Sequence, residues 1–76
     1  MVLEKIISII SEQLETDKSV IKESSNLIDD LGAGSLDMID LAMSIEDEFN
    51  LELSDDDLRK IKTVGDLAAY VEAHAK

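Results

Sequence analysis

One serine of the chain stands in a setting that could carry a covalent group. The segment Asp30-Leu-Gly-Ala-Gly-Ser-Leu-Asp37 places Ser35 after two glycines and at the start of a helical pattern. The glycines allow a sharp turn, and the free N–H groups at a helix N-terminus favour an attached phosphate. The spacing therefore suits a phosphoserine derivative at Ser35. The alternative is a structural one, since serine is also a common helix cap.

Catalysis by Ser35 itself is disfavoured by the residue inventory. A serine nucleophile needs a positioned base, and the one histidine, His74, lies two residues from the C-terminus, where we expect a solvated side chain. The chain has no Cys, which excludes disulfides and thiolate nucleophiles. The Asp55–Asp57 cluster lacks the glycine and the closing Glu of an EF-hand loop. We therefore expect no enzymatic activity and no specific metal site.

Acidic residues are concentrated in the middle of the chain. Lys and Arg total 7 and Asp and Glu total 18, which gives a formal net charge of −11. All seven basic residues lie at or before Lys22 or at or after Arg59, so residues 23–58 hold twelve acidic residues and no basic one. This charge argues against binding to nucleic acid or anionic membranes and favours protein partners with basic surfaces. A solvated face that only aids solubility is the alternative.

The helical pattern over residues 36–50 has two apolar faces. The predicted core face, at 100° per residue, holds Met38, Leu41, Ala42, Ile45 and Phe49. The opposite stripe mixes apolar and acidic side chains: Leu36, Asp40, Met43 and Asp47, with Ile39 and Glu46 beside it. Apolar anchors among carboxylates are typical of a transient docking surface. Scattered surface apolar residues are also common, which is the alternative interpretation.

Helical periodicity and capping signals predict the elements that position these residues. Apolar residues recur at helical spacing over residues 2–15, and a second helix runs from Ser35 or Leu36 to Phe49. Capping boxes at Ser54–Asp57 and Thr63–Asp66 open a short helix near 55–60 and a last helix near 64–74. The sequence thus predicts an all-α fold, a small four-helix bundle of three main helices and one short helix.

A long loop connects the first and second predicted helices. Residues 16–34 lose helical periodicity, apart from a short helical turn expected near residues 18–23. We expect aliphatic side chains to hold this loop on the core: Val20, Ile21, Leu27, Ile28 and Leu31. Long ordered loops in small domains often serve in binding or positioning.

The length of 76 residues suits one domain over residues 1–76. The apolar run Ile6–Ile10 is too short for a signal segment or a membrane span. We expect a complete, soluble, cytoplasmic monomer with no membrane insertion.

The segment Asp30–Asp37 and the helix after it resemble an acyl carrier protein. The matching helix residues are Leu41, Met43, Ile45, Glu46, Asp47, Glu48 and Phe49, and the resemblance covers nearly the whole chain. It implies that a phosphopantetheinyl transferase attaches a 4′-phosphopantetheine arm from coenzyme A to Ser35, whose terminal thiol carries acyl groups as thioesters. The chain would then be a carrier in fatty acid, or related polyketide or lipid, biosynthesis. An unmodified acidic adaptor that only binds proteins is the alternative.

The resemblance also implies where partners and acyl chains bind. Basic patches of synthases, acyltransferases and the transferase would dock on Leu36, Asp37, Asp40, Met43, Glu46 and Asp47. The acyl chain would be sheltered by Ile39, Leu41, Ala42, Ile45, Ile61 and Ala68. One position departs from the family pattern, because Gly34 stands where fatty-acid carriers usually have Asp before the modified serine, and this affects recognition by the transferase.

Overall fold

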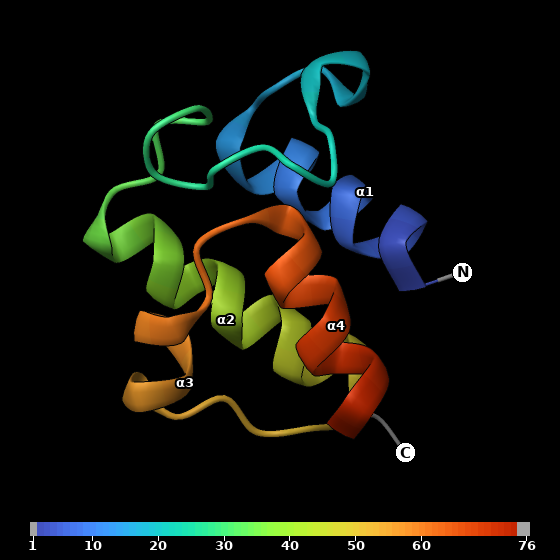
Figure 1. Ribbon diagram of the computed structural model, residues 1–76, viewed down its shortest axis with the longest axis vertical. Coiled ribbons are helices and arrows are strands. Elements are labelled where there is room, and N and C mark those ends of the chain that lie inside the picture. The colour runs from blue at the N-terminus through green and yellow to red at the C-terminus, as the bar shows by residue number, and fades with distance from the viewer. Residues whose placement is uncertain (1, 75–76) are drawn as a thin grey trace.

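A computed structural model describes residues 2–74 and confirms the predicted all-α, four-helix fold with a long first connection (Figure 1). The elements are α1 (Val2–Leu14), the 3-10 turn η1 (Lys18–Val20), α2 (Ser35–Phe49), α3 (Asp55–Lys60) and α4 (Val64–His74). Extended pairing within residues 2–74 is confined to one isolated antiparallel bridge, between Asn26 and Thr63. None of the helices in this range has the length and apolar character that a membrane span requires.

The core lies where α1 packs against α2 and α4. Ile6 and Ile10, one helical turn apart on α1, are fully buried, as the apolar spacing predicts. The other fully buried large side chains are Leu27, Leu41, Ile45, Val64 and Val71. Met38 and Phe49, also predicted on the core face, are only partly buried against this cluster. The core is therefore aliphatic, and α2 faces it with Leu41, Ala42 and Ile45.

Ile45 provides a direct test of this packing. Its side chain is 0% exposed, so Ile45→Ala leaves a cavity and should lower the free energy of unfolding by about 2–5 kcal/mol. The control is Met43→Ala on the same helix, because Met43 is 58% exposed and surface substitutions stay within about 0.5 kcal/mol. Urea titrations followed by circular dichroism measure both. Equal losses for the two variants would contradict the burial of this face.

Backbone hydrogen bonds tie the long loop to the junction between α3 and α4. The Leu27 N–H donates to the Lys62 carbonyl at 2.9 Å, and the Val64 N–H donates to the Ser25 carbonyl at 3.0 Å. The Gly65 N–H donates to a loop carbonyl as well, that of Glu23, at 2.8 Å. The loop therefore has a defined path across the bundle and fixes the approach of the chain to α2.

Two of the five aliphatic residues predicted to hold the loop on the core do not do so. Ile21 and Leu27 are buried and Leu31 is partly buried, but Val20 and Ile28 are 56% and 57% exposed. Val20 ends the η1 turn, a shorter helical turn than predicted. The hydrogen bonds of neighbouring backbone groups set which side chains of such a loop turn outward, and hydrophobicity alone does not reveal this.

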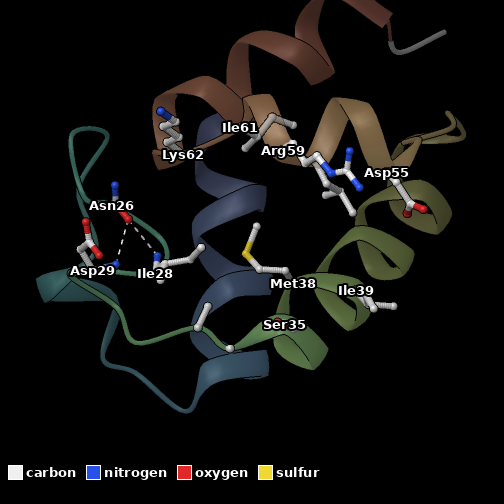
Figure 2. A pocket seen from close by; sticks show the side chains of 13 residues that line it. Asn26, Ile28, Asp29, Ser35, Met38, Ile39, Asp55, Arg59, Ile61 and Lys62 are labelled. Carbon is white, nitrogen blue, oxygen red and sulfur yellow. Dashed lines mark hydrogen bonds between the residues drawn. The ribbon is translucent and has the colours of Figure 1, made fainter.

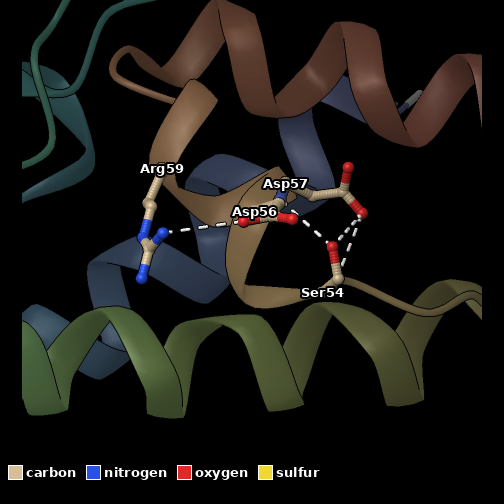
Figure 3. Close-up of polar contacts among 4 residues, drawn as sticks. All are labelled: Ser54, Asp56, Asp57 and Arg59. Atoms are coloured by element: carbon tan, nitrogen blue, oxygen red, sulfur yellow. Dashed lines mark hydrogen bonds and ion pairs between the residues drawn. The ribbon is translucent and has the colours of Figure 1, made fainter.

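A capping box holds the short helix α3 in place (Figure 3). The Ser54 hydroxyl donates to Asp57 Oδ2 at 2.9 Å, and the Asp57 N–H donates to Ser54 Oγ at 3.2 Å. The Tyr70 hydroxyl of α4 donates to the same carboxylate at 2.9 Å. These bonds, that from Ser54 first, lower the pKa of Asp57 below its ordinary value of 3.8. The predicted box at Thr63 and Asp66 also forms and opens α4.

Candidate functional site

Ser35 is the first residue of α2, and its hydroxyl is exposed. Gly34 occupies the N-cap position, and its N–H donates to Asp37 Oδ2 at 3.0 Å. The helical ladder begins with the Met38 N–H, which donates to the Gly34 carbonyl at 3.0 Å. Within residues 2–74 the Ser35 hydroxyl has no hydrogen-bond partner, and the N-cap position is held by Gly34, so Ser35 does not serve as the helix cap that was considered for it. The hydroxyl is free for a covalent attachment.

The two glycines before Ser35 have different roles. Gly32 has a φ of +72°, the left-handed region in which glycine pays no steric penalty. Gly34 is extended, with φ −87° and ψ −178°, a conformation that any residue adopts. A Cβ on Gly34 would lie 3.7 Å from Asp37 Oδ2, an ordinary contact. The turn therefore needs Gly32, whereas Gly34 leaves room for a side chain.

This geometry makes Gly34→Asp a clean test of transferase recognition. We expect the variant to fold as the wild type does, since an added Cβ meets no clash, and to accept the arm faster from a general phosphopantetheinyl transferase. Aspartate is also a better N-cap than glycine by a few tenths of a kcal/mol. Initial rates of arm attachment at equal protein concentrations measure the effect. An unchanged rate would show that position 34 has no part in recognition.

Ser35 lies at the edge of a groove of about 860 Å³ (Figure 2). The groove is walled by the long loop, by the first turns of α2 and by the segment from α3 to Lys62. Its apolar lining consists of Ile28, Ala33, Met38, Ile39, Leu58 and Ile61. Figure 2 shows the Met38 side chain directed into the groove. A flexible chain attached to Ser35 can therefore run along an apolar surface, in a volume typical of ligand sites.

A narrow apolar space lies beneath this groove, with no room for a water molecule. Met38, Leu58 and Ile61 line both spaces. Leu41, Ala42 and Ile45, three of the residues expected to shelter an acyl chain, line the inner one. Ile39 lines only the outer groove, and Ala68 lines neither.

The predicted stripe on α2 is exposed. Leu36 is 76% exposed, Met43 58% and Ile39 49%. Asp40 and Asp47 are exposed as well. Apolar side chains and carboxylates thus alternate along the helix that Ser35 begins, an arrangement that suits a partner with a basic rim and apolar pockets.

Asp37 and Glu46, the other two residues proposed for docking, are only partly exposed and bind backbone groups. Asp37 accepts the Gly34 N–H, as described above. Glu46 Oε2 accepts the Leu53 N–H at 2.8 Å and so holds the segment that leads into α3. This structural role escapes sequence reasoning, because the partner lies seven residues away across an irregular turn.

Two substitutions of Glu46 separate the structural role of its carboxylate from its charge. Glu46→Ala removes the acceptor of a charge-assisted hydrogen bond and should lower the free energy of unfolding by about 1.5–3 kcal/mol. Glu46→Gln keeps an acceptor oxygen and loses only the charge, so its loss should be smaller, below about 1 kcal/mol. Chemical denaturation measures both. Equal stability of the two variants would contradict the structural role of the carboxylate.

His74 lies far from Ser35. Its Nδ1 is 2.9 Å from the Tyr70 carbonyl oxygen and its ring stacks on Tyr70. It also lies beside residues 50–52, which follow the C-terminal end of α2. Because α2 has 15 residues, its two ends are about 22 Å apart at 1.5 Å per residue. His74 thus cannot act as a base for Ser35.

Comparison with known proteins agrees with this site. The family described as "Phosphopantetheine attachment site" matches residues 4–71. The acyl carrier protein of Thermotoga maritima is 52% identical over 71 residues, 93% of this chain and 88% of that protein. That of Clostridium acetobutylicum is 46% identical over 76 residues, covering 100% and 99%. A solved Mycobacterium tuberculosis structure, assigned as an acyl carrier protein, superposes with a TM-score of 0.89 at 38% identity, covering 96% of this chain and 97% of the other.

The fold, the free serine and these matches define a phosphopantetheine-dependent carrier. The chain belongs to the acyl carrier protein family. Its members are not enzymes, bear a 4′-phosphopantetheine prosthetic group and interact with synthase and transferase enzymes. The residues present here fit that group, since an exposed hydroxyl, an uncapped helix N-terminus and an apolar groove meet at Ser35.

Proposed function

We propose that this protein carries a 4′-phosphopantetheine arm on Ser35 and shuttles acyl groups between enzymes of fatty acid, or related polyketide or lipid, biosynthesis in the cytoplasm. When bound, the arm supplies a terminal thiol that holds the acyl group as a thioester. The observation that carries the proposal is the unpartnered Ser35 hydroxyl at the first position of α2, at the edge of the apolar groove.

The residues around Ser35 support this role by their charge and hydrogen bonding. The N–H groups of residues 35–37 precede the first helical hydrogen bond, so they can face a phosphodiester at Ser35. The one histidine of the chain lies at the other end of α2 and cannot serve this hydroxyl as a base. The transferase must therefore remove the serine proton, and the chain acts as its substrate.

The groove supports sheltering of the acyl chain, and the exposed stripe supports docking on enzymes. The apolar side chains of Met38, Leu58 and Ile61 line both the groove at Ser35 and the inner space, and the groove suits a sheltered aliphatic chain. Leu36, Asp40, Met43 and Asp47 suit transient docking on basic enzyme surfaces, with Asp37 and Glu46 contributing charge near them. The protein acts as one carrier domain over residues 1–76.

Thioester loading tests the proposal. The arm-bearing protein is incubated with an acyltransferase of fatty acid biosynthesis and its acyl-coenzyme A donor, and the intact mass is recorded before and after neutral hydroxylamine. We expect one acyl group per chain, removed by hydroxylamine. The control is the protein without the arm, which should gain nothing. Failure of the arm-bearing protein to accept an acyl group would favour the unmodified adaptor.

A further inference from the structure

Ile28 is an exposed isoleucine in the long loop, at the groove that also holds Ser35. Its side chain is 57% exposed and reaches into the groove from the loop side, facing Met38 of α2 (Figure 2). An enzyme that reaches the Ser35 hydroxyl has to cover the mouth of this groove. It then meets α2 on one wall and the loop around Ile28 on the other.

The loop around Ile28 is held rigidly before any partner binds. Asn26 Oδ1 accepts the N–H groups of Ile28 at 3.0 Å and of Asp29 at 2.8 Å, and Asp30 Oδ2 accepts the Asn26 N–H at 2.8 Å (Figure 2). The Gly32 N–H donates to the Ile28 carbonyl at 3.1 Å. A surface that is ordered in advance loses little conformational entropy when a partner binds. The exposure of Ile28 is thus a fixed feature of the surface.

The chemistry around Ile28 repeats that of the stripe on α2. Asp29 and Asp30 follow it directly and are exposed, just as Asp40 and Asp47 flank Met43. Both surfaces thus offer an aliphatic side chain beside carboxylates, and both adjoin Ser35. An enzyme with basic residues around an apolar contact complements both at once.

We propose that Ile28 is a docking contact for the phosphopantetheinyl transferase, on the loop wall of the groove, across from Met38 and Ile39 of α2. The inference rests on the proposed function, because it assumes that the arm is attached at Ser35. It adds a second, loop-borne contact to the partner surface.

The test compares two exposed β-branched residues of the same loop. Val20 is 56% exposed, almost the same as Ile28, but it belongs to η1 and does not line the groove. Apo wild type, Ile28→Thr and Val20→Thr are assayed with a transferase and coenzyme A. Threonine keeps the branched Cβ and the backbone N–H, so the loop hydrogen bonds remain. For Ile28→Thr we expect a KM raised about five- to tenfold with kcat within about twofold, and for Val20→Thr no change beyond about twofold.

Unfolding midpoints of the apo and arm-bearing forms show whether Ile28 contacts the transferase or the arm itself. We expect all three apo proteins to unfold at the same midpoint, with the same midpoint change on arm attachment. A KM for Ile28→Thr equal to that for Val20→Thr would overturn the proposal. A reduced effect of the arm on the midpoint of Ile28→Thr, with an unchanged KM, would show that Ile28 contacts the arm and would overturn it too. If wild type accepts no arm, the proposed function itself fails, and this inference fails with it.

Discussion

Ser35→Ala is expected to abolish arm attachment completely. Phosphopantetheinylation forms a bond between the serine oxygen and the phosphate, and alanine has no oxygen to form it. The structure offers no substitute nearby, because α2 begins at Ser35 and the next residues of its first turn are Leu36 and Asp37. The side chain is exposed and makes no hydrogen bond within residues 2–74, so the variant should fold normally. Intact mass after incubation with coenzyme A and transferase measures the result.

A second serine supplies the matched control for this variant. Ser24 is exposed in the long loop that precedes α2, so Ser24→Ala should accept one arm at the wild-type rate. Both variants are compared with the wild type by circular dichroism before the assay. Any arm on folded Ser35→Ala would show that another residue is the attachment site.

Reversing two charges on α2 should weaken docking by about ten- to a hundredfold. Asp40 and Asp47 are exposed on the stripe that carries Leu36 and Met43. Asp40→Lys with Asp47→Lys turns attraction toward a basic surface into repulsion and removes electrostatic steering. We expect kcat/KM of arm attachment to fall by this amount at low salt. The deficit should shrink at high salt, because screening shortens the reach of these charges to about 3 Å at 1 M.

A control must separate local docking from total charge. Glu4→Lys with Glu72→Lys makes the same change in net charge on exposed positions of α1 and α4. We expect kcat/KM of this variant to stay within about threefold of the wild type, since charges outside the docking surface act on the partner over longer and more screened distances. Equal losses in the two double variants would mean that net charge alone matters and that α2 is no special docking surface.

Local patterns were sufficient to predict the helices and their starts. Apolar spacing predicted α1 to within one residue at its C-terminal end, and the boxes at Ser54 and Thr63 open α3 and α4 as expected. Ser35 was predicted as the attachment site because glycine turns and helix starts are local signals. Such features depend on residues within four positions of one another, and a sequence displays them directly.

Features made by distant segments could not be predicted in this way. The groove beside Ser35 joins the loop, α2 and the α3 region, and no periodicity reports their approach. Ile28 was expected on the core, yet backbone groups bound by Asn26 direct it outward. The docking role of Glu46 stays a prediction, and the bond of its carboxylate to the Leu53 N–H is a further role that the pattern did not reveal. The groove and the Glu46 bond depend on contacts between separate segments, and the orientation of Ile28 depends on hydrogen bonds in a loop that has no periodicity to predict it.

Peptide mapping shows most directly whether the arm is attached to Ser35. Trypsin cuts after Lys and Arg, and none occurs between Lys22 and Arg59, so residues 23–59 form one peptide with Ser35 and four other serines. After incubation with coenzyme A and transferase, fragment masses should place a single phosphopantetheine on Ser35. An arm on another serine, or no arm with transferases of either broad or fatty-acid-type specificity, would contradict the account.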